Sequence, residues 1–442
     1  MSVIGKELDY QQYAISHGSY QMSQVIQQSG GTAVGLSASG GQESIFELSP
    51  KVYNLSRSTL QFTVALPAPG TDYFNWLYLD GIPFIQQLQL YTRSGLFLAD
   101  IQNVNNYANM TMRRSFKSED VLTWDKGNYF EGLIPVNDTK DTNLRYEAGS
   151  SGSTSYFEPV YLSLAVAKNT AGPTVNVQIE LRKIVNSIFS IDKDLYFGGE
   201  ILYLRVVWNP STKIAFGSKS ATDVETDSIA YPKGITMTNL KLYMAVEQNP
   251  TIENELKSKV NSAEGFNLLI PYVYQNKQSL TGTSQNIMIK YSRAHGSKLL
   301  KIYWAPYNST ESASTCYDHR NVSQSKVTQF YTLINNVRTS QFNYLCNGDD
   351  YMVQKNKLKG SCIYSSNEYY YNWVWVEDFT NNYSFIDKPL NPPEENYIDG
   401  LDLSTEIKYD IFANTTNATY NHYVYAICQK TLVVSSSGIS LL

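Results

Sequence analysis

Residues 369–377 read YYYNWVWVE, with five aromatic side chains in the first seven positions. Side chains of a β-strand alternate between two faces. Here neither face is suited to water: one carries Tyr369, Tyr371, Trp373 and Trp375, and the other carries Tyr370, Asn372, Val374 and Val376. A strand with one solvated face instead alternates apolar and polar residues. The stretch therefore predicts a strand covered on both sides, by a core on one side and by another layer, a ligand or a subunit on the other.

The composition favours a large globular protein with extensive contact surfaces. The chain has 442 residues, which as a prior corresponds to two or three domains. Charged residues make up 17% and the formal net charge is −5, so no basic excess exists to attract nucleic acid. Tyrosine (35 residues) outnumbers phenylalanine (17 residues) two to one. Tyrosine is amphipathic and common at interfaces, where one end is dry and the other wet.

The N-terminal stretch, the apolar runs and the cysteines indicate the cellular compartment in which the protein folds. The N-terminal stretch MSVIGKELDYQQYAISHG has no continuous apolar run, so it does not predict a secretory signal. Apolar runs such as 266–274 (FNLLIPYVY) are far shorter than the roughly 20 residues of a membrane-spanning helix. The four cysteines form no CxxC pair and lie at Cys316, Cys346, Cys362 and Cys428. We therefore expect reduced, structural thiols rather than disulfides.

Period-two alternation dominates the chain after a polar N-terminal segment. Residues 1–42 are rich in Gln, Ser and Gly, and are expected to form an extended arm. Beyond them, apolar and polar residues alternate in five clear stretches, at 60–64, 175–181, 202–208, 240–246 and 405–411. Each stretch predicts a β-strand.

Helical signals are few and short. The strongest is 251–265 (TIENELKSKVNSAEG), where Thr251 is the expected N-cap, apolar residues recur every four positions, and Gly265 ends the helix. Weaker signals lie at 104–114 and 349–360. Short strands separated by Gly, Pro, Asn and Ser clusters predict an all-β sandwich or jelly roll.

A polar, weakly periodic stretch divides the chain into two similar halves. Residues 211–234 follow one strong strand signal and precede another, which favours a domain boundary near residue 225. We therefore expect a first β domain over 43–225 and a second over 226–442. Both halves show the same order of strands, a short helical insert, and more strands.

Patterns of residues that carry catalysis or bind cofactors are weak. The glycine-rich stretch 35–41 reads GxSxS rather than the GxSxG of a nucleophile elbow, and neither phosphate-binding nor dinucleotide-binding glycine motifs occur. Cys316, Asp318 and His319 form the sole cluster worth weighing as a metal or catalytic site. Neighbouring residues on an irregular loop rarely point at one ion, so a solvated loop is the plainer interpretation.

Acidic pairs also occur, as Glu377 with Asp378 and as Asp399 with Asp402. Paired carboxylates serve glycoside hydrolysis, but a chain with 40 acidic residues contains such pairs by chance. We therefore expect no catalytic, cofactor-binding or metal-binding residues, no cofactor and no enzymatic activity.

Several stretches of the second half resemble one known family. They lie at 295–311 (HGSKLLKIYWAPYNSTE), 326–343 (KVTQFYTLINNVRTSQFN), 349–361 (DDYMVQKNKLKGS), 369–379 (YYYNWVWVEDF) and 423–442 (YVYAICQKTLVVSSSGISLL). This order resembles the second jelly roll of double jelly-roll major capsid proteins, in the branch of virophages, polinton-like viruses and related large DNA viruses. In the first half, the resemblance rests on 54–64 and 83–95 in the expected places.

The resemblance implies an all-β fold of two consecutive eight-stranded jelly-roll β-sandwiches with short helical inserts. It also implies a structural major capsid protein, whose pseudo-hexagonal homotrimers tile an icosahedral virion shell. The implied partners are neighbouring capsomers, penton proteins, minor capsid or cement proteins, and an internal membrane reached through the N-terminal arm, with no sequence-specific nucleic acid. The chain would be assembled inside the host cell and not secreted.

Two other classes of function stay open from the sequence. Aromatic strands such as the one that carries Tyr371, Trp373 and Trp375 stack on sugars, so a carbohydrate-binding sandwich, either a lectin or a fibre-like attachment protein, is the main alternative. Such a platform needs one face exposed to solvent. A β-rich glycoside hydrolase is the other alternative, and it lacks a convincing acid pair.

Overall fold

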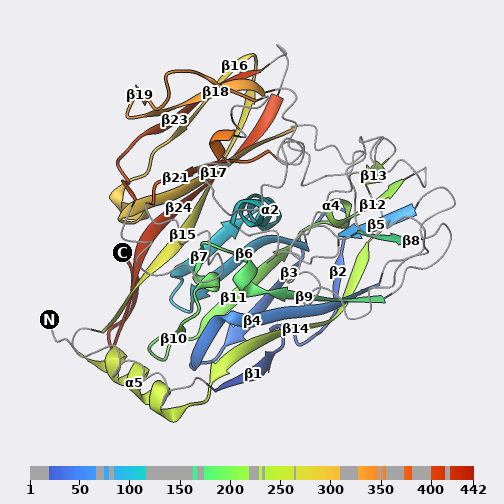
Figure 1. The fold of residues 1–442 in the computed structure, drawn as a ribbon. Coiled ribbons are helices and arrows are strands. Elements are labelled where there is room, and N and C mark those ends of the chain that lie inside the picture. The colour runs from blue at the N-terminus through green and yellow to red at the C-terminus, as the bar shows by residue number, and fades with distance from the viewer. Residues whose placement is uncertain are drawn as a thin grey trace.

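The computed structural model shows two β-sandwiches, one from each half of the chain (Figure 1). Every strand pair in the described sheets is antiparallel, which is typical of sandwiches and jelly rolls. The structure describes residues 19–65, 74–78, 84–115, 163–166, 174–218, 228–230, 234–262, 265–308, 327–346, 350, 352–354, 373–380, 400–413 and 419–442.

The first sandwich is built from two facing sheets. One sheet has the order β1 (Tyr20–Val25), β14 (Ile235–Glu247), β4 (Val52–Ala65) and β10 (Asp194–Tyr196), with β2 (Val34–Leu36) on β14 and β9 (Thr174–Glu180) on β4. The other has the order β3 (Glu43–Leu48), β11 (Leu202–Trp208), β6 (Ile85–Thr92) and β7 (Phe97–Gln102). A small third sheet extends from it, ordered β13 (Ser228–Ala230), β12 (Ala215–Ser218), β5 (Phe74–Tyr78) and β8 (Ser163–Val166) (Figure 1).

The alternation along each strand determines which side chains fill the core. In β11, residues 202, 204, 206 and 208 are buried and the residues between them are half-buried. Trp208 packs edge-on against Phe62 of β4, with ring centroids 5.7 Å apart, and Phe62 packs in the same way on Phe84. The contact between Trp208 and Phe62 joins the two sheets, because β11 and β4 belong to opposite layers.

The second sandwich repeats this plan. One sheet has the order β15 (Phe266–Thr281), β24 (Thr419–Ser435), β17 (Lys298–Asn308) and β21 (Trp375–Asp378), with β22 (Leu401–Asp402) on β17 and β25 (Gly438–Leu441) on β24. The facing sheet has the order β16 (Ser284–Ile289), β23 (Ile407–Ala413), β18 (Val327–Ile334) and β19 (Val337–Arg338), with β20 (Tyr344–Leu345) on β18. Each of the five stretches with period-two alternation contains a strand, as the sequence predicts, although Leu181 already belongs to η2 and residues 405–406 precede β23.

Short helices connect the sandwiches. Helix α2 (Val104–Ser115) lies between them, and α5 (Pro250–Asn261) links the last strand of the first sandwich to the first strand of the second (Figure 1). Other helical elements in the described part of the chain include α4 (Ser211–Ile214), η2 (Leu181–Lys183), η3 (Ile188–Ser190) and η4 (Arg293–His295). None of the helices within the described ranges is long and apolar enough to cross a membrane.

The N-cap of α5 differs from the sequence prediction. Asn249, rather than Thr251, is the capping residue, and its side chain accepts a hydrogen bond from the backbone N–H of Thr251 at 3.0 Å. Pro250 then occupies the first helical turn, where its missing N–H is not needed. Pro250 therefore allows the helix to begin two residues earlier than the prediction.

The sheet pairing also differs from the expected division of the chain. Strands β1 and β2 fall inside the arm expected over 1–42, yet both pair with β14. Strand β14 follows the expected boundary near residue 225, yet it pairs with β4 in the first sandwich. Since a sheet needs all its strands, we propose a boundary at α5, which gives a first jelly roll that ends at residue 247 and a second that begins at residue 266.

Candidate functional site

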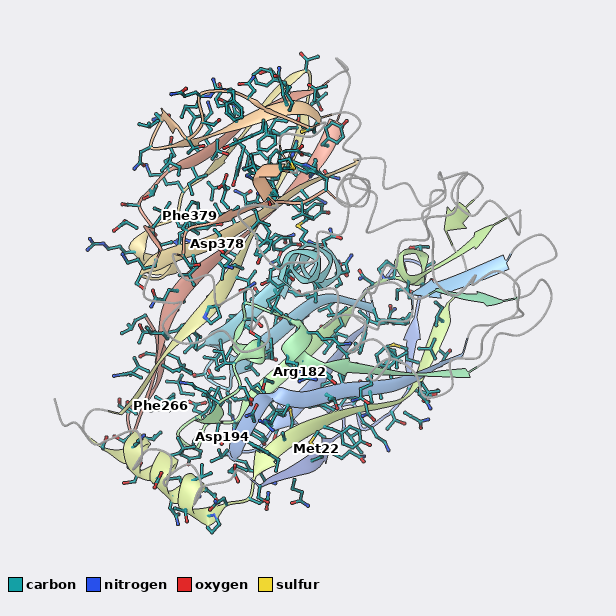
Figure 2. The ribbon with its side chains drawn as sticks, viewed as in Figure 1. Met22, Arg182, Asp194, Phe266, Asp378 and Phe379 are labelled. Carbon is teal, nitrogen blue, oxygen red and sulfur yellow. The ribbon has the colours of Figure 1, made fainter. Side chains whose placement is uncertain are left out.

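The residues weighed as catalytic or metal ligands do not form a site in the described structure. Glu377 accepts hydrogen bonds from Trp375 and Thr332, and Asp378 forms an ion pair with Lys301 at 2.7 Å (Figure 2). Asp402, of the second acidic pair, accepts a hydrogen bond from the backbone N–H of Ser404 within a turn. The remaining residues that were weighed lie outside the described part of the chain, namely Cys316, Asp318, His319 and Asp399. Across the described ranges, no group of three or more His, Cys, Asp or Glu side chains is placed to hold a metal ion.

The aromatic strand is covered on both faces over the part that the structure describes. Trp373 and Trp375 are fully buried, and Val374 and Val376 are each 1% exposed. Phe330 of the facing sheet packs edge-on against both indoles, with ring centroids at 5.6 Å and 4.7 Å. The prediction of a doubly covered strand is therefore confirmed for residues 373–376. The strand begins at residue 375, later than expected, and 369–372 lie outside the described residues.

Buried polar groups orient both indoles. The Nε1–H of Trp373 donates to Asp350 Oδ2 at 2.7 Å, and the Nε1–H of Trp375 donates to Glu377 Oε1 at 2.8 Å. A buried indole N–H needs a partner, because leaving a buried donor unpaired costs about 1–3 kcal/mol. The two carboxylates therefore serve as structural acceptors inside the second sandwich.

Among the described strands, β21 is the last one of its sheet, and one side chain forms hydrogen bonds with its outer edge. The fully buried Gln354 donates from Nε2 to the carbonyl oxygen of Val376 at 3.0 Å, and its Oε1 accepts from the N–H of Val376 at 3.1 Å. The amide thus makes the two hydrogen bonds that a neighbouring strand would make. Exposed sheet edges promote uncontrolled strand pairing, so this amide protects the edge.

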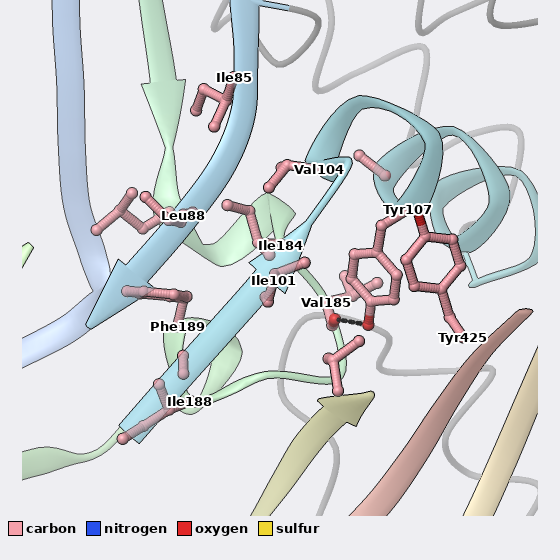
Figure 3. Packing of buried hydrophobic residues seen from close by; sticks show 14 of the residues in the cluster. Ile85, Leu88, Ile101, Val104, Tyr107, Ile184, Val185, Ile188, Phe189 and Tyr425 are labelled. Carbon is pink, nitrogen blue, oxygen red and sulfur yellow. Dashed lines mark hydrogen bonds between the residues drawn. The ribbon is translucent and has the colours of Figure 1, made fainter. Parts of the chain in front are cut away.

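A junction of hydrogen bonds and aromatic rings holds the two sandwiches together. The hydroxyl of Tyr425 in β24 donates to the carbonyl oxygen of Asn103 at 3.1 Å and accepts from Gln275 Nε2 at 3.1 Å. The ring of Tyr425 packs against Tyr107 of α2 at 5.1 Å, and the Tyr107 hydroxyl donates to the carbonyl oxygen of Val185 (Figure 3). Because these groups are buried or half-buried, the junction fixes the two sandwiches relative to each other.

Five apolar side chains are exposed on or near the sheet formed by β16, β23, β18, β19 and β20. They are Met288, Val337, Phe342, Leu345 and Met352, with exposed fractions between 40% and 69%. Arg338 lies over the ring of Tyr331 at 4.2 Å, and Tyr331 lies 6.2 Å from Phe412. We call these five side chains the exposed apolar residues of the second sandwich.

Comparison with known proteins gives similarity at the level of structure. No protein-family model matches the sequence, and no curated protein matches it either. The Faustovirus major capsid protein superposes with a TM-score of 0.57 at 10% identity, over 95% of this chain and 91% of that one. A chain of the Sputnik virophage superposes with a TM-score of 0.53 at 9% identity, over 97% of this chain and 89% of that one. A chain of the PBCV-1 virus capsid superposes with a TM-score of 0.53 at 9% identity, over 96% of this chain and 97% of that one.

These superpositions extend over nearly the whole of each chain, so they include both sandwiches and their order. At 9–10% identity they establish the fold. The all-β prediction of two consecutive jelly rolls with short helical inserts is confirmed. The resemblance seen in the quoted stretches of both halves is therefore matched by the structure, which has the double jelly-roll fold of viral major capsid proteins.

Proposed function

We propose that this protein is a structural major capsid protein of a virion shell. The supporting observation is the fold match, which covers at least 95% of this chain in three capsid structures. The described side chains add no competing chemistry, since the buried carboxylates Glu377 and Asp350 accept hydrogen bonds from indoles. In this proposal the chain has no enzymatic activity, and its function depends on shape and contact surfaces.

The functional unit in this proposal is a homotrimer with a pseudo-hexagonal outline. Two similar sandwiches per chain give six per trimer. A trimer with six nearly equivalent corners has a hexagonal outline, and copies of such a particle tile a plane. The fixed junction at Tyr425 supports this outline, because a lattice needs the two sandwiches at one angle. The exposed apolar residues of the second sandwich supply side chains for contact between subunits. Obligate interfaces in such assemblies bury more than roughly 2,000 Å².

The trimers would tile an icosahedral shell and contact neighbouring capsomers, pentons, and minor capsid or cement proteins. Residues 1–18, which belong to the N-terminal arm expected from the sequence, lie outside the described residues, and we propose that they contact an internal membrane or a neighbouring trimer. Sequence-specific nucleic acid has no part in the proposal, because the chain has a net charge of −5.

The aromatic strand no longer supports the carbohydrate-binding alternative. A sugar platform needs aromatic faces open to solvent, whereas Trp373 and Trp375 are fully buried between the two sheets of their sandwich. A glycan array on the purified protein tests what remains of this alternative, and saturable binding to one sugar class would favour it.

Light scattering coupled to gel filtration, followed by negative-stain microscopy, tests the proposal. We expect the mass of three chains and hexagonal particles. Val337→Glu places a charge at one of the exposed apolar residues of the second sandwich, which is 69% exposed, and we expect it to reduce the trimer fraction. Leu442→Glu is the matched control, since Leu442 is equally exposed but lies on the other sheet of the same sandwich, and it should leave the trimer intact. A well-folded wild-type monomer at micromolar concentration would contradict the proposal.

A further inference from the structure

A fully buried histidine lies between the two sheets of the second sandwich. His422 of β24 is surrounded by Trp304 of β17, Tyr420 of its own strand, and Gln285 of β16. Strand β16 belongs to the facing sheet, so the hydrogen bond between His422 and Gln285 crosses from one layer to the other. The sequence alone singles out no such role for this histidine.

The partners of His422 determine its protonation state. The indole Nε1–H of Trp304 lies 3.2 Å from His422 Nδ1, and because an indole nitrogen only donates, Nδ1 must accept. The ring proton is therefore on Nε2, which donates to Gln285 Oε1 at 2.7 Å. Gln285 is held in the orientation that offers its oxygen, because its Nε2 donates to the carbonyl oxygen of Gly282 at 2.8 Å. The arrangement fits a neutral imidazole and no other state.

The surrounding charged groups do not compensate a positive charge on this ring. Nearby strands carry Lys301, which is paired with Asp378, and Lys277, which lies over the ring of Tyr423. Glu377 of β21 is engaged by indole and hydroxyl donors, Tyr409 of β23 is a neutral phenol, and β16 has no ionisable residue. Burial lowers the pKa of His422 to about 3, and within the described part of the chain no carboxylate opposes this shift.

We propose that His422 is an acid-sensitive latch, whose protonation breaks the tie between the two sheets and opens the second jelly roll while the first stays closed. An added proton on Nδ1 would face the Trp304 N–H, donor against donor, so the hydrogen bond between them is lost. The ring then needs water, and water reaches it only when the sheets separate. Of the histidines in the described residues, His295 and His422, both lie in the second sandwich.

The direction of the pH effect follows from the pKa difference between the two states. The pKa is about 3 in the closed sandwich and about 6.5 when the ring is exposed, so the open state binds the proton more tightly. The latch is at full strength above pH 6.5 and weakens as the pH falls from 6.5 toward 3. Each pH unit in this window changes the ratio of open to closed sandwiches about tenfold.

Hydrogen exchange with mass spectrometry, corrected for the intrinsic pH dependence of exchange, tests the latch on the intact protein. Between pH 6.5 and 4.5 we expect the protection of peptides in β16, β17 and β24 to fall about 50-fold, because an exposed ring is already half protonated at pH 6.5. Peptides in β4 and β11 should change much less. The inference concerns the single chain, so it is tested independently of the proposed capsid function.

Two variants separate the latch from general acid sensitivity. His422→Asn retains an acceptor for Trp304 without a titrating ring, and its second-sandwich protection should change little between pH 6.5 and 4.5. His295→Asn, at a half-buried site beside Tyr274, should behave as the wild type. If the two sandwiches of the wild type lose protection together, or if His422→Asn follows the wild type, the latch does not exist. The wild-type comparison decides the matter even if His422→Asn fails to fold.

Discussion

Truncation of Trp373 to alanine should remove most of the stability of the second jelly roll. The indole is fully buried and packs on Trp304 at 5.0 Å and on Phe330 at 5.6 Å. Loss of a buried tryptophan ring typically costs about 3–5 kcal/mol. The same change removes the indole donor from the buried carboxylate of Asp350, which adds about 1–3 kcal/mol. The expected loss is then roughly 4–8 kcal/mol, against about 5–15 kcal/mol for a typical folded domain.

Urea unfolding followed by far-UV circular dichroism measures this loss. Trp373→Phe retains a buried ring and removes the indole N–H, so its cost should lie well below that of the alanine variant. Phe342→Ala, at a residue that is 56% exposed, is the matched control and should change stability by no more than about 0.5 kcal/mol. If Trp373→Ala unfolds within 1 kcal/mol of the wild type, the indole is not part of the core and the interpretation of the opening stretch is wrong.

Three further substitutions test other parts of the fold. Tyr425→Phe removes the hydroxyl that joins the two sandwiches and should lower the free energy of unfolding by about 1 kcal/mol. In calorimetry the first unfolding transition should shift to lower temperature, and an unchanged profile would show that the junction is held by packing alone. Asn249→Ala removes the N-cap of α5 and should cost about 1 kcal/mol, whereas Asn249→Ser should restore most of it in the same urea assay. Gly296→Ala should abolish soluble expression, because its Cβ would overlap the carbonyl oxygen of Gln429, whereas Gly282→Ala, with a positive φ but open space, should remain soluble.

Part of this architecture is readable from the sequence because the relevant signals are local. The alternation in residues 202–208 and 240–246 identifies strands, since burial on one face requires it. The coverage of Trp373 and Val374 on opposite faces follows from the same rule. The fold class needed more than alternation, because the order of the quoted stretches in the second half provided the resemblance to capsid proteins.

Other features are invisible in the sequence because they depend on distant partners. The polar stretch around residue 225 looks like a domain boundary, but β14 pairs with β4, which lies far back in the chain. No local pattern specifies that partner. Similarly, Gln354 and His422 look like ordinary polar residues until the fold places one on a sheet edge and the other between two layers.

The pairing of β14 with β4 has a consequence for how the protein is made. Lys241 pairs with Gln61, so the first sheet stays incomplete until the ribosome has synthesised more than half of the chain. At about 5–20 residues per second, one edge of β4 stays without its partner strand for on the order of ten to forty seconds. During that time Leu60, Phe62 and Val64 lack the strand that lies beside them in the finished sheet. Nascent chains should therefore depend on chaperones until β14 has emerged, and chains truncated before residue 235 should aggregate.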